Sequence, residues 1–105
     1  MWVANQTGAS VSEFNAATGD FVQVVAGASY GFNLPFGIAF DGLHLWVTNL
    51  DGNSVTEISH VDGSLVQTLA GGAYGFSAPG GAAFDGSRMW FANSSGNSVT
   101  DVPVT

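Results

Sequence analysis

The sequence contains no cysteine and no lysine, and its only strongly basic side chain, Arg88, stands against eight carboxylates. Without cysteine the chain has no disulfide framework, thiolate zinc site or cysteine nucleophile. Without a basic stripe it has nothing to neutralise phosphates, so nucleic acid is excluded as a partner. The apolar runs are a few residues long, far short of the roughly 20 needed to cross a bilayer, and no membrane insertion is expected.

The composition is apolar and poor in charge. Of the 105 residues 46% are hydrophobic and 9% charged, and the formal net charge is −7. This length corresponds to one globular domain or to part of one. The missing lysine and the abundance of Ser, Thr, Asn and Gly favour an extracellular or cell-envelope location.

The chain repeats itself with a period of 44 residues. When the sequence is shifted by 44 positions against itself, 28 of 61 aligned residues are identical, which is far above chance. Two sets of residues recur: Trp2, Asn5, Gly8, Ser10 and Val11 reappear around Trp46 and Trp90, and Tyr30, Gly31, Phe32, Pro35, Phe40, Asp41 and Gly42 reappear from Tyr74 to Gly86. Such a period is typical of a stacked or radial repeat architecture.

Each repeat reads as four short strands separated by turn residues. The predicted strands of the middle repeat are 36–40, 45–49, 54–59 and 65–69, and the turns between them contain Asp-Gly pairs. None of the segments between the glycines contains a stretch of ten residues with helical periodicity, so we predict an all-β protein. Apolar residues run consecutively through several strands, which indicates that both faces of each sheet are covered. A four-stranded antiparallel unit of this size with two covered faces is a β-propeller blade.

The repeat resembles known propeller families. The segment Leu45-Trp46-Val47-Thr48-Asn49, followed by Gly52-Asn53-Ser54-Val55 and preceded by Phe40-Asp41-Gly42, resembles the bacterial YVTN and NHL repeats and the streptogramin-lyase-type propellers. The resemblance covers nearly the whole chain. It implies that residues 37–41 form the innermost strand, that 45–49 and 54–59 form the middle strands, and that 65–69 form the outermost one.

The chain holds about 2.4 repeats, and propellers of this type have at least four blades. Residues 1–30 are predicted to be a partial blade with strands two to four, 31–74 a complete blade, and 75–105 a partial blade with strands one to three. The ring is therefore incomplete in one chain, and two apolar blade faces stay open. We interpret the start inside a blade as the mark of a truncated, excised, engineered or filament-forming chain. The expected partners are copies of the chain itself, which complete the blades as a closed ring or a stack.

Two groups of acidic residues recur at fixed repeat positions. Glu13, Glu57 and Asp101 share one position, and Asp41 and Asp85 share another. Circles of carboxylates can bind calcium or polarise a substrate. The alternative, which we prefer, is that the aspartates serve Asp-Gly turns and the third-strand acids lie on a solvated edge. No metal site or cofactor is therefore expected.

The two histidines are the only residues in the sequence that suggest catalysis. His44 and His60 are not part of the shared repeat, and asymmetry of this kind is typical of a catalytic site in a propeller. The resemblance to streptogramin lyases implies a histidine base with an acid nearby, and His44 with Glu57 is the pair that fits. The interpretation that we prefer is that His44 is an exposed polar residue beside an Asp-Gly turn. We therefore expect no enzyme, with a streptogramin-lyase-like enzyme or a fragment of one as the alternative.

The connections 27–35 and 71–79 are expected to lie at one end of the sheets, together with the Asp51-to-Asn53 turn. Tyrosines and asparagines there suit a glycan or a peptide, which gives a predicted ligand-binding set: Tyr30, Asn33, Asp51, Asn53, Tyr74 and Asn97. Alternatively, Phe32 and Phe76 wedge between blades, and Asn53 and Asn97 supply left-handed turn conformations. Trp2, Trp46 and Trp90 are expected in the core between blades. The predicted function is a non-catalytic propeller module that acts as a scaffold or recognition surface.

Overall fold

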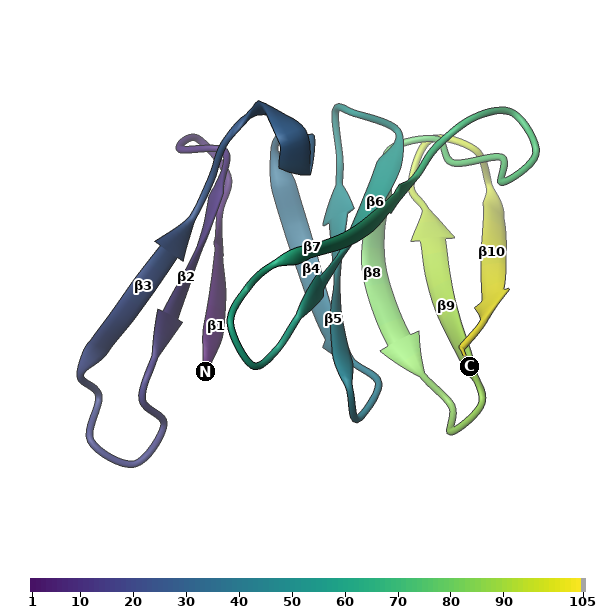
Figure 1. Cartoon of the computed structure of the whole chain (residues 1–105). Coiled ribbons are helices and arrows are strands. Elements are labelled where there is room, and N and C mark those ends of the chain that lie inside the picture. Colours follow the sequence, from purple (N-terminus) through teal and green to yellow (C-terminus); the bar gives the residue numbers. More distant parts are fainter. Residues whose placement is uncertain (105) are drawn as a thin grey trace.

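The computed structural model describes residues 1–104 and contains three antiparallel sheets that follow one another along the chain (Figure 1). The N-terminal sheet has the order β1 (Trp2–Asn5), β2 (Ser10–Phe14), β3 (Phe21–Val25). The central sheet has the order β4 (Pro35–Phe40), β5 (His44–Asn49), β6 (Ser54–Ser59), β7 (Leu65–Leu69). The C-terminal sheet consists of β8 (Pro79–Phe84), β9 (Arg88–Asn93) and β10 (Ser98–Pro103).

The all-β prediction is confirmed, with two local differences. A single 3-10 turn, η1 (Ala28–Tyr30), precedes the central sheet and ends at Gly31, whose φ of 68° is left-handed. β2 ends at Phe14, although the sequence pattern predicts a strand from Ser10 to Asn15, because the side chain of Asn15 accepts hydrogen bonds from the Ala17 and Thr18 amides and closes a turn. Within residues 1–104 no helix has the length and hydropathy to cross a membrane.

An asparagine ties two neighbouring strands together in each sheet: β1 to β2, β5 to β6, and β9 to β10. In the central sheet Asn49 is fully buried, and its Nδ2 donates to the hydroxyls of Ser54 at 3.1 Å and Thr56 at 2.9 Å. Its Oδ1 accepts from the Asn33 amide at 3.3 Å. Asn5 and Asn93 donate to the hydroxyls five and seven residues later in the same way. This uncharged network fixes the end of each sheet from which the connections leave.

The main core lies between the central and C-terminal sheets. One cluster of buried side chains fills this space: Trp46, Val55, Leu69, Phe76, Met89 and Phe91. The rings of Trp46 and Phe91 lie 6.1 Å apart between centroids. The expectation that Phe76 wedges between sheets is thus confirmed, and so is the buried position of Trp46, which is 2% exposed.

Trp90 does not lie in the core, so the prediction for this residue was wrong. It is 40% exposed, although it occupies the repeat position of Trp46. The reason is the neighbour: Trp46 faces the C-terminal sheet, whereas Trp90 lies on the outer face of that sheet, which no other sheet covers among residues 1–104. Trp2 is half-buried.

The first strands of adjacent sheets approach closely at two glycines. β4 lies beside β8, and Thr48 joins them: its hydroxyl accepts from the Gly37 amide at 2.8 Å and donates to the Gly80 carbonyl at 2.7 Å. A methyl group at Gly37 would meet the Gly80 carbonyl oxygen far inside van der Waals contact. The spacing between these sheets therefore depends on the missing side chain of Gly37.

Candidate functional site

The predicted loop residues of the central sheet come together at one end of the molecule, where Figure 1 shows the connections between sheets and the β5–β6 turn. The Asp51 amide donates to the Asn33 carbonyl at 3.3 Å. The side chain of Asn53 accepts from the Ala78 amide at 2.8 Å and so links this turn to the next connection. Asn53 and Asn97 have φ values of 50° and 52°, which confirms their left-handed turn conformations. Asn97 is exposed in the corresponding turn of the C-terminal sheet.

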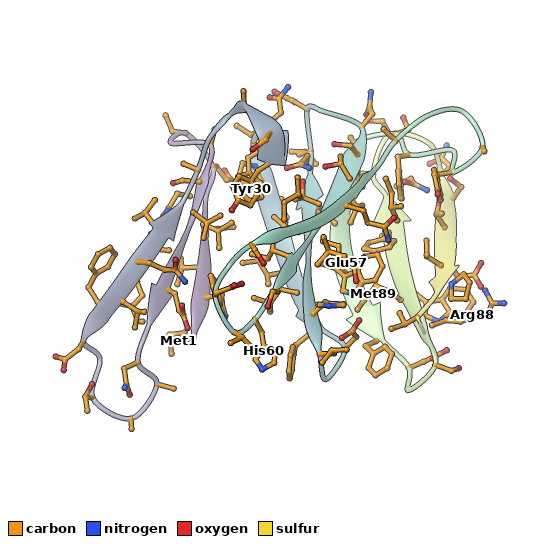
Figure 2. All side chains as sticks on the ribbon, viewed as in Figure 1. Met1, Tyr30, Glu57, His60, Arg88 and Met89 are labelled. Carbon is orange, nitrogen blue, oxygen red and sulfur yellow. The ribbon has the colours of Figure 1, made fainter. Side chains whose placement is uncertain are left out.

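The two predicted tyrosines pack within the connections. Tyr30 stacks on Phe32 with 5.4 Å between centroids, and Tyr74 stacks on Phe76 with 5.5 Å. The Tyr30 hydroxyl donates to the Gly63 carbonyl at 2.9 Å, so the ring seen in Figure 2 holds η1 against the β6–β7 turn. Both tyrosines are half-buried. The two tyrosines therefore contribute to packing within the protein, and only part of each side chain is accessible to a ligand.

The pair His44 and Glu57, which the lyase alternative singled out, is brought together in the structure. Nδ1 of His44 lies 2.7 Å from Glu57 Oε2. The other Glu57 oxygen accepts from Gln67 Nε2 at 2.8 Å. Asp41 is close enough that one ligand atom from each of the three acidic or imidazole groups lies within 4.8 Å of the others. This cluster has the donor types of a divalent cation site.

The hydrogen bonds of the cluster are satisfied by the protein itself. Asp41 Oδ1 accepts from the Leu43 and His44 amides at 2.8 and 2.6 Å, and Oδ2 accepts from the Trp46 indole at 2.8 Å. Contrary to the predicted solvated edge, Glu57 is only 4% exposed. The adjacent strand β7 supplies Gln67, which covers this carboxylate and satisfies it.

The same arrangement recurs in the C-terminal sheet without a histidine. Arg88 occupies the position of His44, and its guanidinium donates to Asp101 at 2.7 Å. Asp85 accepts from the Ser87 and Arg88 amides and from the Trp90 indole, as Asp41 does in the central sheet. In both of these sheets a basic side chain of the second strand therefore pairs with an acid of the third strand. The Asp-to-Trp bond at a spacing of five residues was missed, although both copies of the spacing are visible in the sequence.

Hydrogen bonding sets the acidity of the two turn aspartates. The Trp90 indole, followed by the Ser87 and Arg88 amides, lowers the pKa of Asp85 from 3.8 to about 2. Burial raises the pKa of Asp41, but the bonds from the His44 amide, the Trp46 indole and the Leu43 amide outweigh it and leave the pKa below its usual value. Both carboxylates therefore stay charged in mildly acidic solution.

We expect Trp90→Phe to raise the pKa of Asp85 part of the way back toward 3.8, because the indole donor is its largest cause of depression. Since the folded-state pKa is the lower one, the contribution of Asp85 to stability is complete above about pH 4 and is lost as pH falls toward 2. In Trp90→Phe the folded-state pKa of Asp85 lies closer to 3.8, so the pH range over which this contribution is lost should become narrower. Carboxyl NMR titration measures the pKa directly, and an unchanged value in Trp90→Phe would contradict the assignment.

An apolar hollow marks the outer face of the C-terminal sheet. It has a volume of about 340 Å³ and is lined by Gly81, Ala82, Ala83, Trp90, Phe91, Ala92 and Val99. Val99 is 62% exposed, whereas Val55, at the same repeat position in the central sheet, is fully buried. This face presents the side chains that the central sheet buries against its neighbour.

The opposite end of the molecule presents the complementary face. Met1 and Val3 of the N-terminal sheet are 66% and 42% exposed. Their repeat equivalents, Met89 and Phe91, are fully buried against the central sheet. These are the two open blade faces that the incomplete number of repeats predicts.

Comparison with known proteins identifies the architecture. No known protein-family profile matches the chain. No curated protein matches it either. Among solved structures, 98% of the chain superposes on hydrazine synthase of Kuenenia stuttgartiensis with a TM-score of 0.84 and 24% identity. It also superposes over its full length on the β-propeller domain of Cps50 (Swd1) from Myceliophteria thermophila with a TM-score of 0.68 and 10% identity. The chain has the fold of β-propeller blades.

A third neighbour is the virginiamycin B lyase of Staphylococcus aureus, with a TM-score of 0.72, 17% identity and 98% of this chain covered. The chain spans only 29% of the hydrazine synthase chain, 37% of the lyase and 40% of the Cps50 domain. At these identities the likeness concerns the fold. The three sheets are thus neighbouring propeller blades, and their ring is incomplete within this chain.

Proposed function

We propose that this chain is a non-catalytic β-propeller module that associates with copies of itself through its open blade faces and acts as a structural scaffold. One observation carries the proposal. Trp46 is 2% exposed between two blades, and Trp90, at the same repeat position, is 40% exposed on a blade face with no neighbour among residues 1–104. Exposed apolar patches of this kind mark interaction surfaces in soluble proteins.

The chemistry of the two open faces supports a second copy as the occupant. The C-terminal sheet offers Trp90 and Val99, the equivalents of Trp46 and Val55 on one side of the internal interface. The N-terminal sheet offers Met1 and Val3, which correspond to Met89 and Phe91 on its other side. Head-to-tail contact between copies would therefore repeat an interface that the chain already contains. Because the two faces differ, such contacts close into a ring or extend as a stack.

The repeated pairing of a basic side chain with an acid supports a structural role over the lyase alternative. His44 and Glu57 sit in the same geometry as Arg88 and Asp101, and arginine cannot act as a general base at neutral pH. Both Glu57 oxygens and both Asp41 oxygens already accept hydrogen bonds from the protein. We therefore assign this pair to cohesion between strands.

The test is the molar mass as a function of concentration, measured by light scattering after size exclusion and by sedimentation velocity. The wild-type mass should rise with concentration toward that of an oligomer. Val99→Asp, which places a carboxylate on the open apolar face, should weaken association by about 10-fold or more. Val61→Asp is the matched control, because Val61 is 76% exposed in the β6–β7 turn and away from the blade faces.

Two results would overturn the proposal. One is a wild-type chain that is folded by circular dichroism and stays monomeric over the whole concentration range. The other is an equal loss of association in Val61→Asp and Val99→Asp, which would show that charge alone, rather than the open face, controls assembly.

A further inference from the structure

The free edge of β1 borders an apolar pocket on the inner side of the N-terminal sheet. β1 pairs with β2 along one edge, and within residues 1–104 no strand pairs with its other edge. Beside it lies a pocket of about 370 Å³ between the N-terminal and central sheets. Its lining is mainly apolar and aromatic: Trp2, Ile38, Phe40, Leu45 and His60. This pocket is separate from the open face of the C-terminal sheet.

In the other two sheets a strand occupies the corresponding place. β4 pairs with β5 and puts Ala39 opposite Trp46, where Ala39 packs against the buried core cluster. β8 pairs with β9 and puts Ala83 opposite Trp90. Both strands share the pattern Pro-x-Gly-x-Ala-Phe-Asp-Gly, over residues 35–42 and 79–86. The chain therefore shows twice which sequence fits beside a strand of the β1 type.

The tryptophan of β1, Trp2, lacks the aspartate acceptor that the indole N–H has in the other two sheets. The Trp46 indole donates to Asp41 at 2.8 Å, and the Trp90 indole donates to Asp85 at 2.8 Å. In each case the aspartate directly follows the paired first strand. Trp2 occupies the same repeat position and lines the pocket, but among residues 1–104 its indole N–H donates no hydrogen bond.

We propose that the β1 edge and its pocket bind an extended peptide segment of the type Pro-x-Gly-x-Ala-Phe-Asp-Gly. The segment adds to the sheet antiparallel to β1, so that main-chain hydrogen bonds to the free edge provide affinity. Its alanine lies opposite Trp2, its phenylalanine lies opposite Met1, and its aspartate accepts from the Trp2 indole. Specificity comes from the small alanine, which lies opposite the tryptophan in both internal copies, and from the aspartate.

The experiment uses a synthetic peptide with the sequence of residues 33–42, titrated into the full chain while the Trp2 indole signal is followed by NMR. Saturable binding with a shift of the indole proton and slower amide exchange along β1 is the expected result. Trp2→Phe in the protein, or Asp41→Ala in the peptide, should each weaken binding by about 10-fold, because each removes a hydrogen bond to a charged group. Combining both changes should weaken it no further than either alone.

Controls separate this site from association of copies. The titration is repeated with Val99→Asp, in which peptide binding should persist even though association is weakened. A scrambled peptide of the same composition should not bind. Absence of binding by the native peptide, equal binding by the scrambled one, or additive effects of the two changes would overturn the proposal. The peptide variant leaves the protein untouched, so the result does not depend on how well Trp2→Phe folds.

Discussion

Replacing Trp46 with alanine is expected to lower the free energy of unfolding by about 3–5 kcal/mol, the usual cost of deleting a large buried aromatic side chain. The indole is 2% exposed, faces Phe91 and donates to Asp41. Since domains of this size are stable by only about 5–15 kcal/mol, the variant should be close to unfolding at room temperature. Urea denaturation followed by circular dichroism measures the change.

Trp90→Ala is the matched control for this substitution. Trp90 donates the same bond of 2.8 Å to an aspartate five residues earlier, but it is 40% exposed. In dilute solution we expect a loss below about 1 kcal/mol, typical of substitutions outside the core. The difference between the two variants isolates the burial of the indole between blades. Equal losses at low concentration would contradict the assigned packing, whereas a loss for Trp90→Ala that grows with concentration would reflect association.

A second large effect is expected for Gly37→Ala. The added methyl group would press against the Gly80 carbonyl oxygen and against the Thr48 hydroxyl that bridges β4 and β8. Backbone atoms cannot move aside as a flexible side chain can, so the two sheets must shift. We expect a loss of about 1–3 kcal/mol, the range for overpacking of a well-packed interior. The same denaturation experiment provides the measurement.

Gly81 offers the matched control, since it holds the equivalent position in β8 and a methyl group there meets nothing within 4 Å. Neither glycine has a left-handed φ, so backbone conformation does not separate the two variants. Gly81→Ala should leave the stability of the isolated chain nearly unchanged. If Gly37→Ala is equally harmless, the close approach of β4 and β8 is not the constraint that sets their spacing.

The repeat was sufficient to predict the three sheets because strand pattern and turn chemistry are local. Runs of β-branched and aromatic residues between Asp-Gly turns define strands whichever sheet they belong to. The left-handed Asn53 and Asn97 follow from the same local chemistry. Burial is different, because it depends on what lies beyond the sheet. Trp46 and Trp90 have the same local sequence but different neighbours, and so the prediction failed for Trp90.

The polar contacts show the same difference between what local sequence determines and what depends on neighbouring strands. The pairing of His44 with Glu57 could be suspected from the sequence, because the two strands form a hairpin and the pair was the only asymmetric one available. The burial of Glu57 could not, since it depends on Gln67 from the next strand. The bond from Trp46 to Asp41 could have been predicted from the sequence. An aspartate and a tryptophan five residues apart occur in two repeats, at Asp41 and at Asp85.

The asparagine, serine and threonine network at the turn end of each sheet has a consequence for the effect of salt. Asn49, Ser54 and Thr56 hold their strands together through neutral dipoles, which mobile ions screen very little. The net charge of −7, in contrast, is felt between molecules that approach each other. Ionic strength should therefore act on the encounter of two chains, by relieving their mutual repulsion, and leave the integrity of each sheet largely untouched.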